Sequence, residues 1–598
     1  MLKKTKLAAA IAAGMVATSA SAVNVSPNGT GEVLVFPYYN VNNGFQTQFS
    51  VVNTTNTYKA VKIRLRESNA SNDVLDFNLY MSPRDVWTAT ISASGDGAQL
   101  TTADNTCTYP DNAGLKAGVQ LRDIYDVTSA ADTREGYIEV IEMGTIPTGL
   151  LTSGNYNTVA LPAGVVTAGA PGKTGTTLVS QIKHNGSGTP VNCGAIQAAW
   201  TNAVAGGVPV FTQGGGLYDA DLNPANGVNL PGTAGTIAAN DPLNLANPTG
   251  GLMGEEIFLN VSTGSAYVAE PVALQHVSDI GTNGINGAQH YRPDDTNLYL
   301  LPSLASGEVG TVDVPHGPGT KVSGATQPDG RHIAEVTWPQ TLVDNGLIDP
   351  NIAPNIAVPS GVNPFPVANA LAVISMANEY FVEAAFDGAT DWVVTLPMKK
   401  HGIFNGTAPM LDTNATVGGN QPGQRALNNS ESGGRADVEI AFSTWSREEQ
   451  QTTSSDFSPP LQSSISLEKE VNILSLTTSG TTLPTNPVLG STQAQALGTN
   501  FESGWGSITF NGRYDLYNST VPNRYMNATN TAFIPNAATT YGVEGFVNNV
   551  AAGAAVVDIS GVPAIGFAAI RGNTGDANVQ VGETYPHKVT NVDAEYGL

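Results

Sequence analysis

The sequence predicts a mainly β protein with two or more antiparallel β-sandwich (Ig-like) units, long polar insertions and a few short helices. Near the N-terminus, short segments that alternate between apolar and polar residues recur about every 10 to 15 residues, which is typical of antiparallel sandwiches. Turn-forming Gly, Asn and Asp residues separate these segments. With 41% hydrophobic and 13% charged residues, the chain can bury a core although it is poor in charge.

The alternating segments define an N-terminal β unit, residues 23–145. Asn43 and Gly44 tolerate the positive φ of a hairpin turn. In the segment 61–66, we expect Val61, Ile63 and Leu65 to face the core, and the basic residues between them to face solvent. The strands expected in this unit are 32–36, 45–53, 61–66, 74–80, 86–91 and 136–142.

Three regions follow this unit. Residues 146–250 form an insertion region rich in Gly, Asn and Pro, with a short helix near 195–203. Residues 251–364 form a central β segment with loops, and residues 365–598 form a C-terminal β unit. In the C-terminal unit we expect a helix at 368–378 and strands at 379–386, 391–396, 437–445, 471–476, 506–510 and 564–570.

The first 22 residues have the pattern of a cleavable export signal. Three lysines within the first six residues precede an apolar run from Leu7 to Val16, and Ala20-Ser21-Ala22 matches a cleavage site. The apolar run is about half the roughly 20 residues that a membrane-spanning helix needs. We therefore expect an extracytoplasmic protein, at the cell surface or outside the cell rather than in the periplasm, with no transmembrane helix in the mature chain.

The charge of the chain excludes partners that are themselves strongly anionic. The formal net charge is −24. The leader holds three of the 26 basic residues and no acid, so the 50 acidic residues of the mature chain outweigh 23 basic ones by 27 charges. Such a surface repels nucleic acids and anionic lipid headgroups.

The only two cysteines are Cys107 and Cys193. In an oxidising compartment, a disulfide between them is the default expectation, and it would be worth about 4 kcal/mol in the chain-entropy model. Two free thiols or a metal site are the alternatives. Neither cysteine has a second Cys or a His at ligand spacing, which argues against a metal site.

A cation site is expected most readily at Asp219, Asp221 and Asn223. Their D-x-D-x-N spacing can direct three side-chain oxygens to one point, as Ca²⁺ requires. The segment departs from an EF-hand loop at Pro224, where that loop needs Gly, and at Leu230, where it needs an acid. The alternative is a turn rich in Asx residues. No other cofactor is indicated.

The sequence shows no catalytic motif. Its seven histidines are far apart, and neither a nucleophile elbow nor a phosphate-binding loop is present. Ser466-Leu467-Glu468-Lys469 matches the S-x-x-K spacing of some serine acylases but lacks the accompanying K-T-G. Acidic pairs are numerous, and spacing alone cannot identify the two carboxylates of a glycosidase.

Five phrases of the sequence stand together here: Gly31–Tyr39, Ser50–Thr55, Val74–Tyr80, Thr390–Pro397 and Pro563–Phe567. They resemble a group of exported, functionally uncharacterised Gram-negative β-rich proteins of the surface type. The resemblance covers about a tenth of the chain, and it implies a shared secreted β scaffold with variable insertions. It implies no catalytic residues.

These observations together favour a secreted structural protein of the cell surface: a surface-layer, matrix or adhesin-like component. Ca²⁺ would assist its assembly, and its partners would be further copies of itself or components of the cell envelope. Two alternatives remain open: a secreted carbohydrate-active enzyme and an outer-membrane β-barrel. They differ in what a structure should show, namely a cleft with close carboxylates and exposed aromatics, or an outward apolar band.

Overall fold

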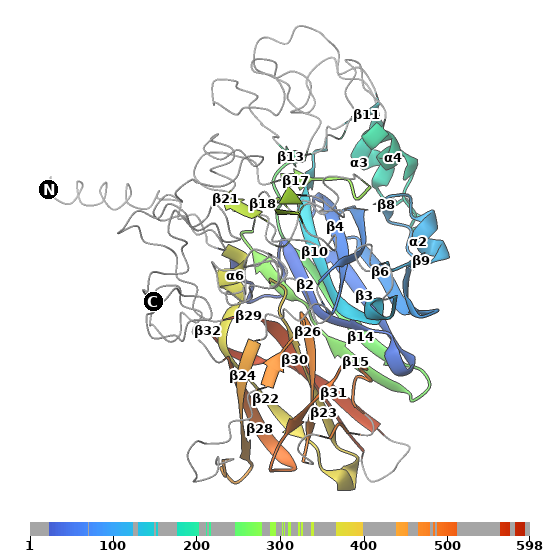
Figure 1. Ribbon diagram of the computed structural model, residues 1–598. Helices are drawn as coiled ribbons and strands as arrows, with labels where there is room; N and C mark the ends of the chain where they lie inside the picture. The colour runs from blue at the N-terminus through green and yellow to red at the C-terminus, as the bar shows by residue number, and fades with distance from the viewer. Residues whose placement is uncertain are drawn as a thin grey trace, which may run out of the picture.

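The computed structural model shows two β-sandwiches stacked against each other (Figure 1). The prediction of a mainly β protein with antiparallel sandwich units is confirmed. The structure describes residues 23–69, 71–122, 130–148, 151–153, 176–201, 211, 214–216, 245–277, 288–294, 302, 304, 309–312, 321–322, 325–326, 336–339, 366–398, 438–451, 465–478, 482–484, 487–510, 562–573 and 580–591.

The N-terminal sandwich pairs two antiparallel sheets. Its inner sheet, which faces the second sandwich, has the strand order β1 (Asn24–Val25), β16 (Val272–Gln275), β2 (Val33–Asn40), β10 (Glu135–Ile146), β4 (Tyr58–Glu67), β5 (Asp73–Met81), β8 (Cys107–Tyr109). Its outer sheet has the order β15 (Ser265–Ala269), β14 (Leu252–Asn260), β3 (Phe45–Asn53), β6 (Val86–Ser94), β7 (Gly97–Thr101), β9 (Val119–Gln120).

The C-terminal sandwich is built in the same way. Its inner sheet has the order β27 (Gln495–Gly498), β26 (Val471–Thr477), β23 (Ala389–Thr395), β30 (Ile565–Asn573), β31 (Gln580–Pro586). Only the pair β26–β27 is parallel among these four large sheets. The outer sheet has the order β25 (Ile465–Leu467), β24 (Val438–Ser446), β28 (Ser503–Phe510), β22 (Ala372–Phe381), β29 (Val562–Pro563), with β32 (Lys588–Asn591) also paired to β22.

Shorter elements lie outside these sheets. The helices are α2 (Ala113–Ala117), α3 (Leu178–Ile182), α4 (Gly194–Thr201) and α6 (Pro366–Leu371), with 3-10 turns at Asn42–Gly44, Ala130–Arg134 and Ala384–Phe386. The short strand pairs are β11 (Leu151–Ser153) with β12 (Thr176–Thr177), β13 (Gly214–Gly216) with β17 (Ala288–His290), β18 (Val309–Val312) with β21 (Val336–Pro339), and β19 (Lys321–Val322) with β20 (Ala325–Thr326).

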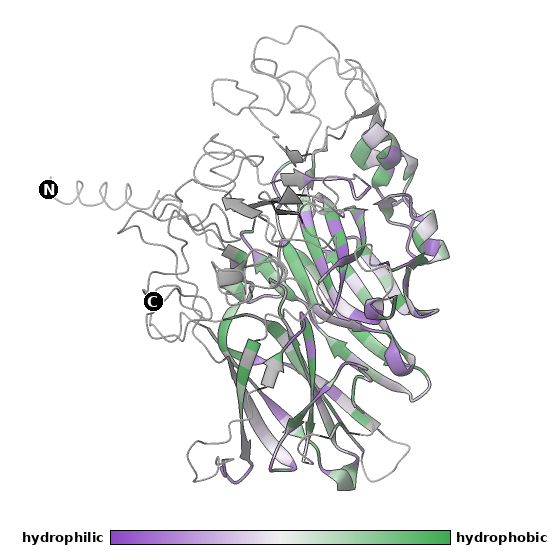
Figure 2. Cartoon of the chain, in the orientation of Figure 1, coloured by the Kyte–Doolittle hydropathy of each residue, from purple (hydrophilic) through white to green (hydrophobic). Residues whose placement is uncertain are grey.

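Each sandwich has its own apolar core because alternate residues of a strand point to opposite faces. Figure 2 shows this alternation as hydrophobic and hydrophilic bands along the strands. In the N-terminal sandwich, Ile63 and Phe77 of the inner sheet pack in one cluster with the fully buried Trp87 of the outer sheet. In the C-terminal sandwich, the fully buried Trp392 of the inner sheet packs with Ile508 of the outer sheet.

A third apolar cluster joins the two sandwiches. The opposite faces of the two inner sheets contribute Val33 and Val35 from β2, and Val393 and Phe567 from β23 and β30. The edge of the outer N-terminal sheet reaches the same cluster, where the rings of Phe258 and Phe567 stack with centroids 5.7 Å apart. The molecule is therefore four sheets deep, and neither inner sheet has a face that is entirely open to water.

The predicted disulfide between Cys107 and Cys193 is present, with the two Cα atoms 5.1 Å apart. It links β8, at the edge of the inner N-terminal sheet, to the residue that precedes α4. Behind it, Trp200 of α4 donates a hydrogen bond from Nε1 to the hydroxyl of Tyr80 on β5, at 2.9 Å. The disulfide thus fixes the helical segment to the sandwich.

Two local predictions were wrong. The helix expected at 368–378 ends at Leu371, and the chain continues as strand β22, because β28 and β32 hydrogen-bond to both of its edges. The basic residues Lys62, Arg64 and Arg66, expected in solvent, are fully buried. Their face of the sheet is covered by chain segments that are distant in sequence, which alternation cannot reveal.

Pairing between distant segments also organises the middle of the chain. Strands β14, β15 and β16, which the sequence places in a central segment, hydrogen-bond into the two N-terminal sheets, next to β3 and β2.

The expected export signal, residues 1–22, lies outside the described residues. In the part of the chain that the structure describes, none of the helices has the length and apolar character needed to cross a membrane.

Candidate functional site

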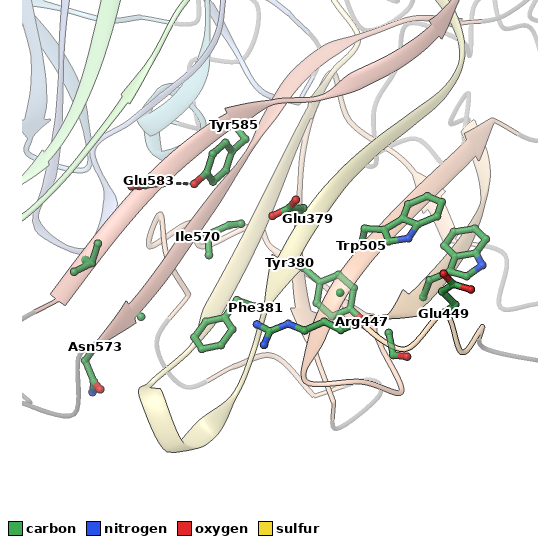
Figure 3. Close-up of a pocket in the computed structure, with 15 residues that line it drawn as sticks. Glu379, Tyr380, Phe381, Arg447, Glu449, Trp505, Ile570, Asn573, Glu583 and Tyr585 are labelled. Carbon is green, nitrogen blue, oxygen red and sulfur yellow. Dashed lines mark hydrogen bonds between the residues drawn. The ribbon is translucent and has the colours of Figure 1, made fainter.

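A pocket of about 800 Å³ opens on the C-terminal sandwich (Figure 3). Strands β22, β24 and β28 of the outer sheet line one side, and β30 and β31 of the inner sheet line the other. This volume lies in the range of protein ligand sites, which commonly span about 300–1,000 Å³. Its lining combines aromatic rings with acidic side chains.

Three side chains form a row across the outer sheet. Trp505 on β28 lies directly opposite Glu379 on β22 and opposite Trp445 on β24. The two indole rings stack nearly parallel, with centroids 4.0 Å apart and planes 8° apart. One face of Trp505 is therefore covered by Trp445, and the other is turned towards Glu379. Trp505 is 43% exposed, which is unusual for so large an apolar residue.

Glycines on both sides of Trp505 allow the strands to approach closely. A Cβ atom at Gly504 would lie 1.9 Å from the carbonyl oxygen of Trp445. A Cβ atom at Gly506 would lie 2.8 Å from the ring of Phe442. The Gly-Trp-Gly sequence thus places one indole on the surface between two positions that admit no side chain.

The facing wall of the pocket is strand β31. Val581, Glu583 and Tyr585 alternate onto the pocket side, and Tyr585 is 41% exposed. The hydroxyl of Tyr585 donates a hydrogen bond to the carboxylate of Glu583. This hydrogen bond, together with partial burial, raises the pKa of Tyr585 above its ordinary value. In the view of Figure 3, Glu379 lies between Tyr585 and Trp505.

The opposite side of β31 rests on the N-terminal sandwich. The hydroxyl of Thr584 donates to the carbonyl oxygen of Val268 on β15. A Cβ atom at Gly582 would lie 2.4 Å from the ring of Tyr267. The position of this pocket wall therefore depends on the contact between the two sandwiches.

A tight turn after β24 adds charged groups at the rim. The backbone N–H of Ser446 donates to the carbonyl oxygen of Gln450 at 2.9 Å, and the turn between them carries Arg447 and Glu449. Within the described residues, the side chains of Glu379, Arg447 and Glu449 have no hydrogen-bond or ion-pair partner. The carboxylates can accept hydrogen bonds from a ligand and the guanidinium can donate them.

A second charged cluster lies on the inner N-terminal sheet, and it is closed to solvent. Nε of Arg66 is 2.6 Å from Oε1 of Glu139, and Nη1 of Arg64 is 3.6 Å from Oε2 of the same carboxylate. Nζ of Lys62 is 3.6 Å from Oδ1 of Asp76. All five side chains are at most 4% exposed. The cluster therefore pairs its cations with carboxylates out of contact with solvent.

The chain that covers this cluster contacts it through backbone oxygens. Arg64 donates from Nη1 to the carbonyl oxygen of Pro302 at 2.9 Å, and Asn78 donates from Nδ2 to that of Tyr291 at 2.8 Å. Nε of Arg64 also lies 2.9 Å from the carboxylate of Asp73. These hydrogen bonds hold Tyr291 and Pro302 against the sheet.

The predicted calcium ligands Asp219, Asp221 and Asn223 lie outside the described residues. Among the residues that are described, no three His, Cys, Asp or Glu side chains come together in a group that could hold a metal ion.

Sequence reasoning missed the pocket, although one signal was present. On β28, residues 506, 508 and 510 are buried and form the apolar face, so Trp505 has the opposite parity and must point outwards. By the same parity, Trp445 on β24 lies on the strand face opposite to that of the buried Val438 and Ile440. Two outward tryptophans on strands that proved to be neighbours would have indicated a surface site.

Comparison with known proteins gave no match: none was found among family models, curated proteins or solved structures.

Proposed function

We propose that this protein is an exported, adhesin-like component of the cell surface that binds carbohydrate in the pocket of its C-terminal sandwich. The observation that carries the proposal is the row formed by Glu379, Trp505 and Trp445, with an exposed indole beside a carboxylate that has no partner among the described residues. The leader-like N-terminus and the acidic composition support the compartment.

The chemistry of the pocket suits a sugar ring. The carbon-bound hydrogens on one face of a pyranose form an apolar surface that can stack on an indole, which buries apolar area on both partners. The hydroxyl groups around the ring then donate to Glu379 and Glu583 and accept from Arg447, and such bonds to charged groups are stronger than neutral ones. Binding sites on rigid β scaffolds generally combine these two elements.

The proposal is tested by measuring the affinity of the purified protein for a panel of soluble polysaccharides in native affinity gels. Trp505→Ala should weaken binding by about tenfold or more, the factor that corresponds to ~1.4 kcal/mol of lost contact. Met253→Ala is the matched control, because Met253 is 42% exposed on the N-terminal sandwich, close to the 43% of Trp505. If no polysaccharide binds, or if both variants bind like the unaltered protein, the proposal fails.

One observation favours a second candidate function, the hydrolysis of carbohydrate. Glu379, Glu449 and Glu583 line one pocket, and glycosidases act through two carboxyl groups on either side of the scissile bond. Incubation with a bound polysaccharide should then reduce its mean mass, and Glu379→Gln or Glu583→Gln should abolish the loss. An unchanged polymer mass would leave binding as the role of the pocket.

The proposed surface role includes assembly assisted by Ca²⁺, with Asp219, Asp221 and Asn223 as ligands. The excess of acidic residues supports this, because a divalent cation can bridge carboxylates of neighbouring copies. A chelator added to intact cells should release the protein into the medium. Retention in excess chelator would contradict assembly through Ca²⁺, and it would leave the carbohydrate site untouched.

A further inference from the structure

We infer that the saccharide bound in the C-terminal pocket carries free, protonated amino groups, as in a polymer of de-N-acetylated amino sugars. This inference rests on the proposed carbohydrate-binding function and names the class of its ligand. It is carried by the juxtaposition, in one pocket, of unneutralised carboxylates with exposed aromatic faces.

The charges that line the pocket are unbalanced. Glu379, Glu449 and Glu583 contribute three carboxylates, whereas Arg447 is the one cationic side chain among the lining residues. The Tyr585 hydroxyl satisfies Oε2 of Glu583, and it is a neutral donor that leaves the charge in place. A ligand that brings positive charge would restore the balance, as opposed charges do across other interfaces.

Like the carboxylates, the aromatic rings of the pocket favour a cationic ligand. The face of an indole or phenol ring is the negative end of its quadrupole, so a cation placed over it is attracted. Trp445 covers one face of Trp505 and leaves the other turned towards Glu379. An ammonium group between that face and the Glu379 carboxylate would interact favourably with both.

The size of the pocket selects an amino sugar over a small ammonium ion. A volume of about 800 Å³ accommodates several sugar rings, whereas a single alkylammonium would leave most of it filled with water. Anionic saccharides are disfavoured by the like charge of the three carboxylates and of the whole chain, whose net charge is −24. Neutral saccharides can stack on Trp505 but gain nothing from the carboxylate charge beyond hydrogen bonds.

The experiment compares three oligosaccharides of equal length by isothermal titration calorimetry: glucosamine, N-acetylglucosamine and glucose oligomers. The glucosamine oligomer should bind about tenfold more tightly than the other two at low salt, and the advantage should shrink as salt rises. Glu379→Gln should lower the affinity for the glucosamine oligomer far more than the affinity for the glucose oligomer, so that the preference for the amine falls about tenfold. Glu255→Gln, which alters an exposed carboxylate of the N-terminal sandwich, is the matched control.

Each outcome decides between the two proposals. Equal binding of all three oligomers would overturn the preference for amines and leave carbohydrate binding intact. Binding of none of them, together with a failure of the wider polysaccharide panel, would overturn both. A preference for the amine that Glu379→Gln, Glu449→Gln and Glu583→Gln all leave unchanged would place the cation elsewhere and overturn the inference. Circular dichroism checks that each Gln variant is folded.

Discussion

Glu135 and Ser491 join the two sandwiches through a buried hydrogen bond, in which the Ser491 hydroxyl donates to Oε2 of Glu135 at 2.7 Å. Glu135 begins strand β10 of the N-terminal sandwich, and Ser491 lies in the loop between β26 and β27 of the C-terminal sandwich. The same carboxylate accepts hydrogen bonds from the backbone N–H of Thr492 at 3.0 Å, from the Tyr38 hydroxyl at 2.8 Å and from Nδ2 of Asn42 at 2.6 Å. One carboxylate thus organises donors from both sandwiches.

Glu135→Ala should weaken the contact between the sandwiches. It leaves these four donors without an acceptor, and each such group costs on the order of 1–3 kcal/mol, so we expect a loss of at least about 4 kcal/mol in the free energy of unfolding. Ser491→Ala removes a single donor and should cost about 1 kcal/mol. Scanning calorimetry should show one transition for the unaltered protein and two for Glu135→Ala.

An equal effect of the two substitutions would contradict this account, because it would mean that Glu135 contributes no more than its bond to Ser491. The pocket provides a second readout. Since β31 rests on β15, Glu135→Ala should also weaken carbohydrate binding, although Glu135 does not line the pocket.

Reduction of the Cys107–Cys193 disulfide should loosen the helical segment around α4. The bond joins residues separated by 86 positions, for which the chain-entropy model gives about 4 kcal/mol. Trp200 is buried in one apolar cluster with Cys107, and Cys193 packs against that cluster. We therefore expect a red shift of tryptophan fluorescence at a denaturant concentration that leaves the sheets intact. A double Cys→Ser variant should show the shift without reductant, and reductant should change it no further. A shift that coincides with global unfolding would show that the helical segment is not a separate unit.

The buried pair Lys62–Asp76 should make stability depend on pH near neutrality. Burial raises the pKa of Asp76 to about 7 and lowers the pKa of Lys62 to about 8. For Asp76, the folded pKa exceeds the unfolded value of about 3.9, so its contribution to stability falls as pH rises from about 4 to 7. For Lys62 the folded pKa is below the unfolded value, so its contribution is recovered as pH rises from about 8 to 10.4.

The pair therefore stabilises the fold least between about pH 7 and pH 8. The double substitution Lys62→Met with Asp76→Leu removes both charges, and such replacements are often stabilising by about 1–4 kcal/mol. Urea unfolding at pH 5, 7.5 and 10 should show the largest gain over the unaltered protein at pH 7.5. The single substitution Arg66→Met serves as a contrast, because it leaves Glu139 without its closest partner and should destabilise at all three pH values. A gain that is equal at all three pH values would refute the titration argument.

The sequence located most strands because their alternation is a local property. Val61, Ile63 and Leu65 face the sandwich core as expected, and the strand Phe45–Asn53 has the predicted bounds. The same alternation led to a wrong prediction for Lys62, because a basic residue on the strand face that is not apolar is usually in contact with water. Here the other side of the sheet is covered by the second sandwich and by Tyr291 and Pro302, more than 200 residues away in sequence.

The site could not be located because it depends on which strands become neighbours. Trp445 and Trp505 are 60 positions apart, and only the register of β24 and β28 brings their rings together. Tyr585 lies at the pocket because β31 pairs with β30, opposite Ala568, and rests on β15. The disulfide was predictable for a different reason: with only two cysteines in the chain, one pairing is available.

His587 should make the C-terminal sandwich sensitive to acid. It is buried between the two sheets, where Nε2 lies 3.0 Å from the carbonyl oxygen of Val393 and Nδ1 lies 3.1 Å from Nδ2 of Asn378. Because a carbonyl oxygen only accepts, the ring proton is on Nε2, and Nδ1 accepts from the Asn378 amide. Burial lowers the pKa of His587 to about 4, so the ring is neutral in the folded state.

For a base whose folded pKa lies below its unfolded value of about 6.5, the contribution to stability is complete above pH 6.5 and is lost as pH falls towards 4. Urea unfolding of the unaltered protein should therefore show a decline over this range. His587→Gln can retain a donor and an acceptor without titrating, so its stability should decline less between pH 6.5 and 4. Because His587 lies between β31 and β32, acid should also weaken carbohydrate binding, and less so in His587→Gln. Identical pH slopes for the two proteins would show that His587 stays neutral in both folded and unfolded chains or titrates outside this range.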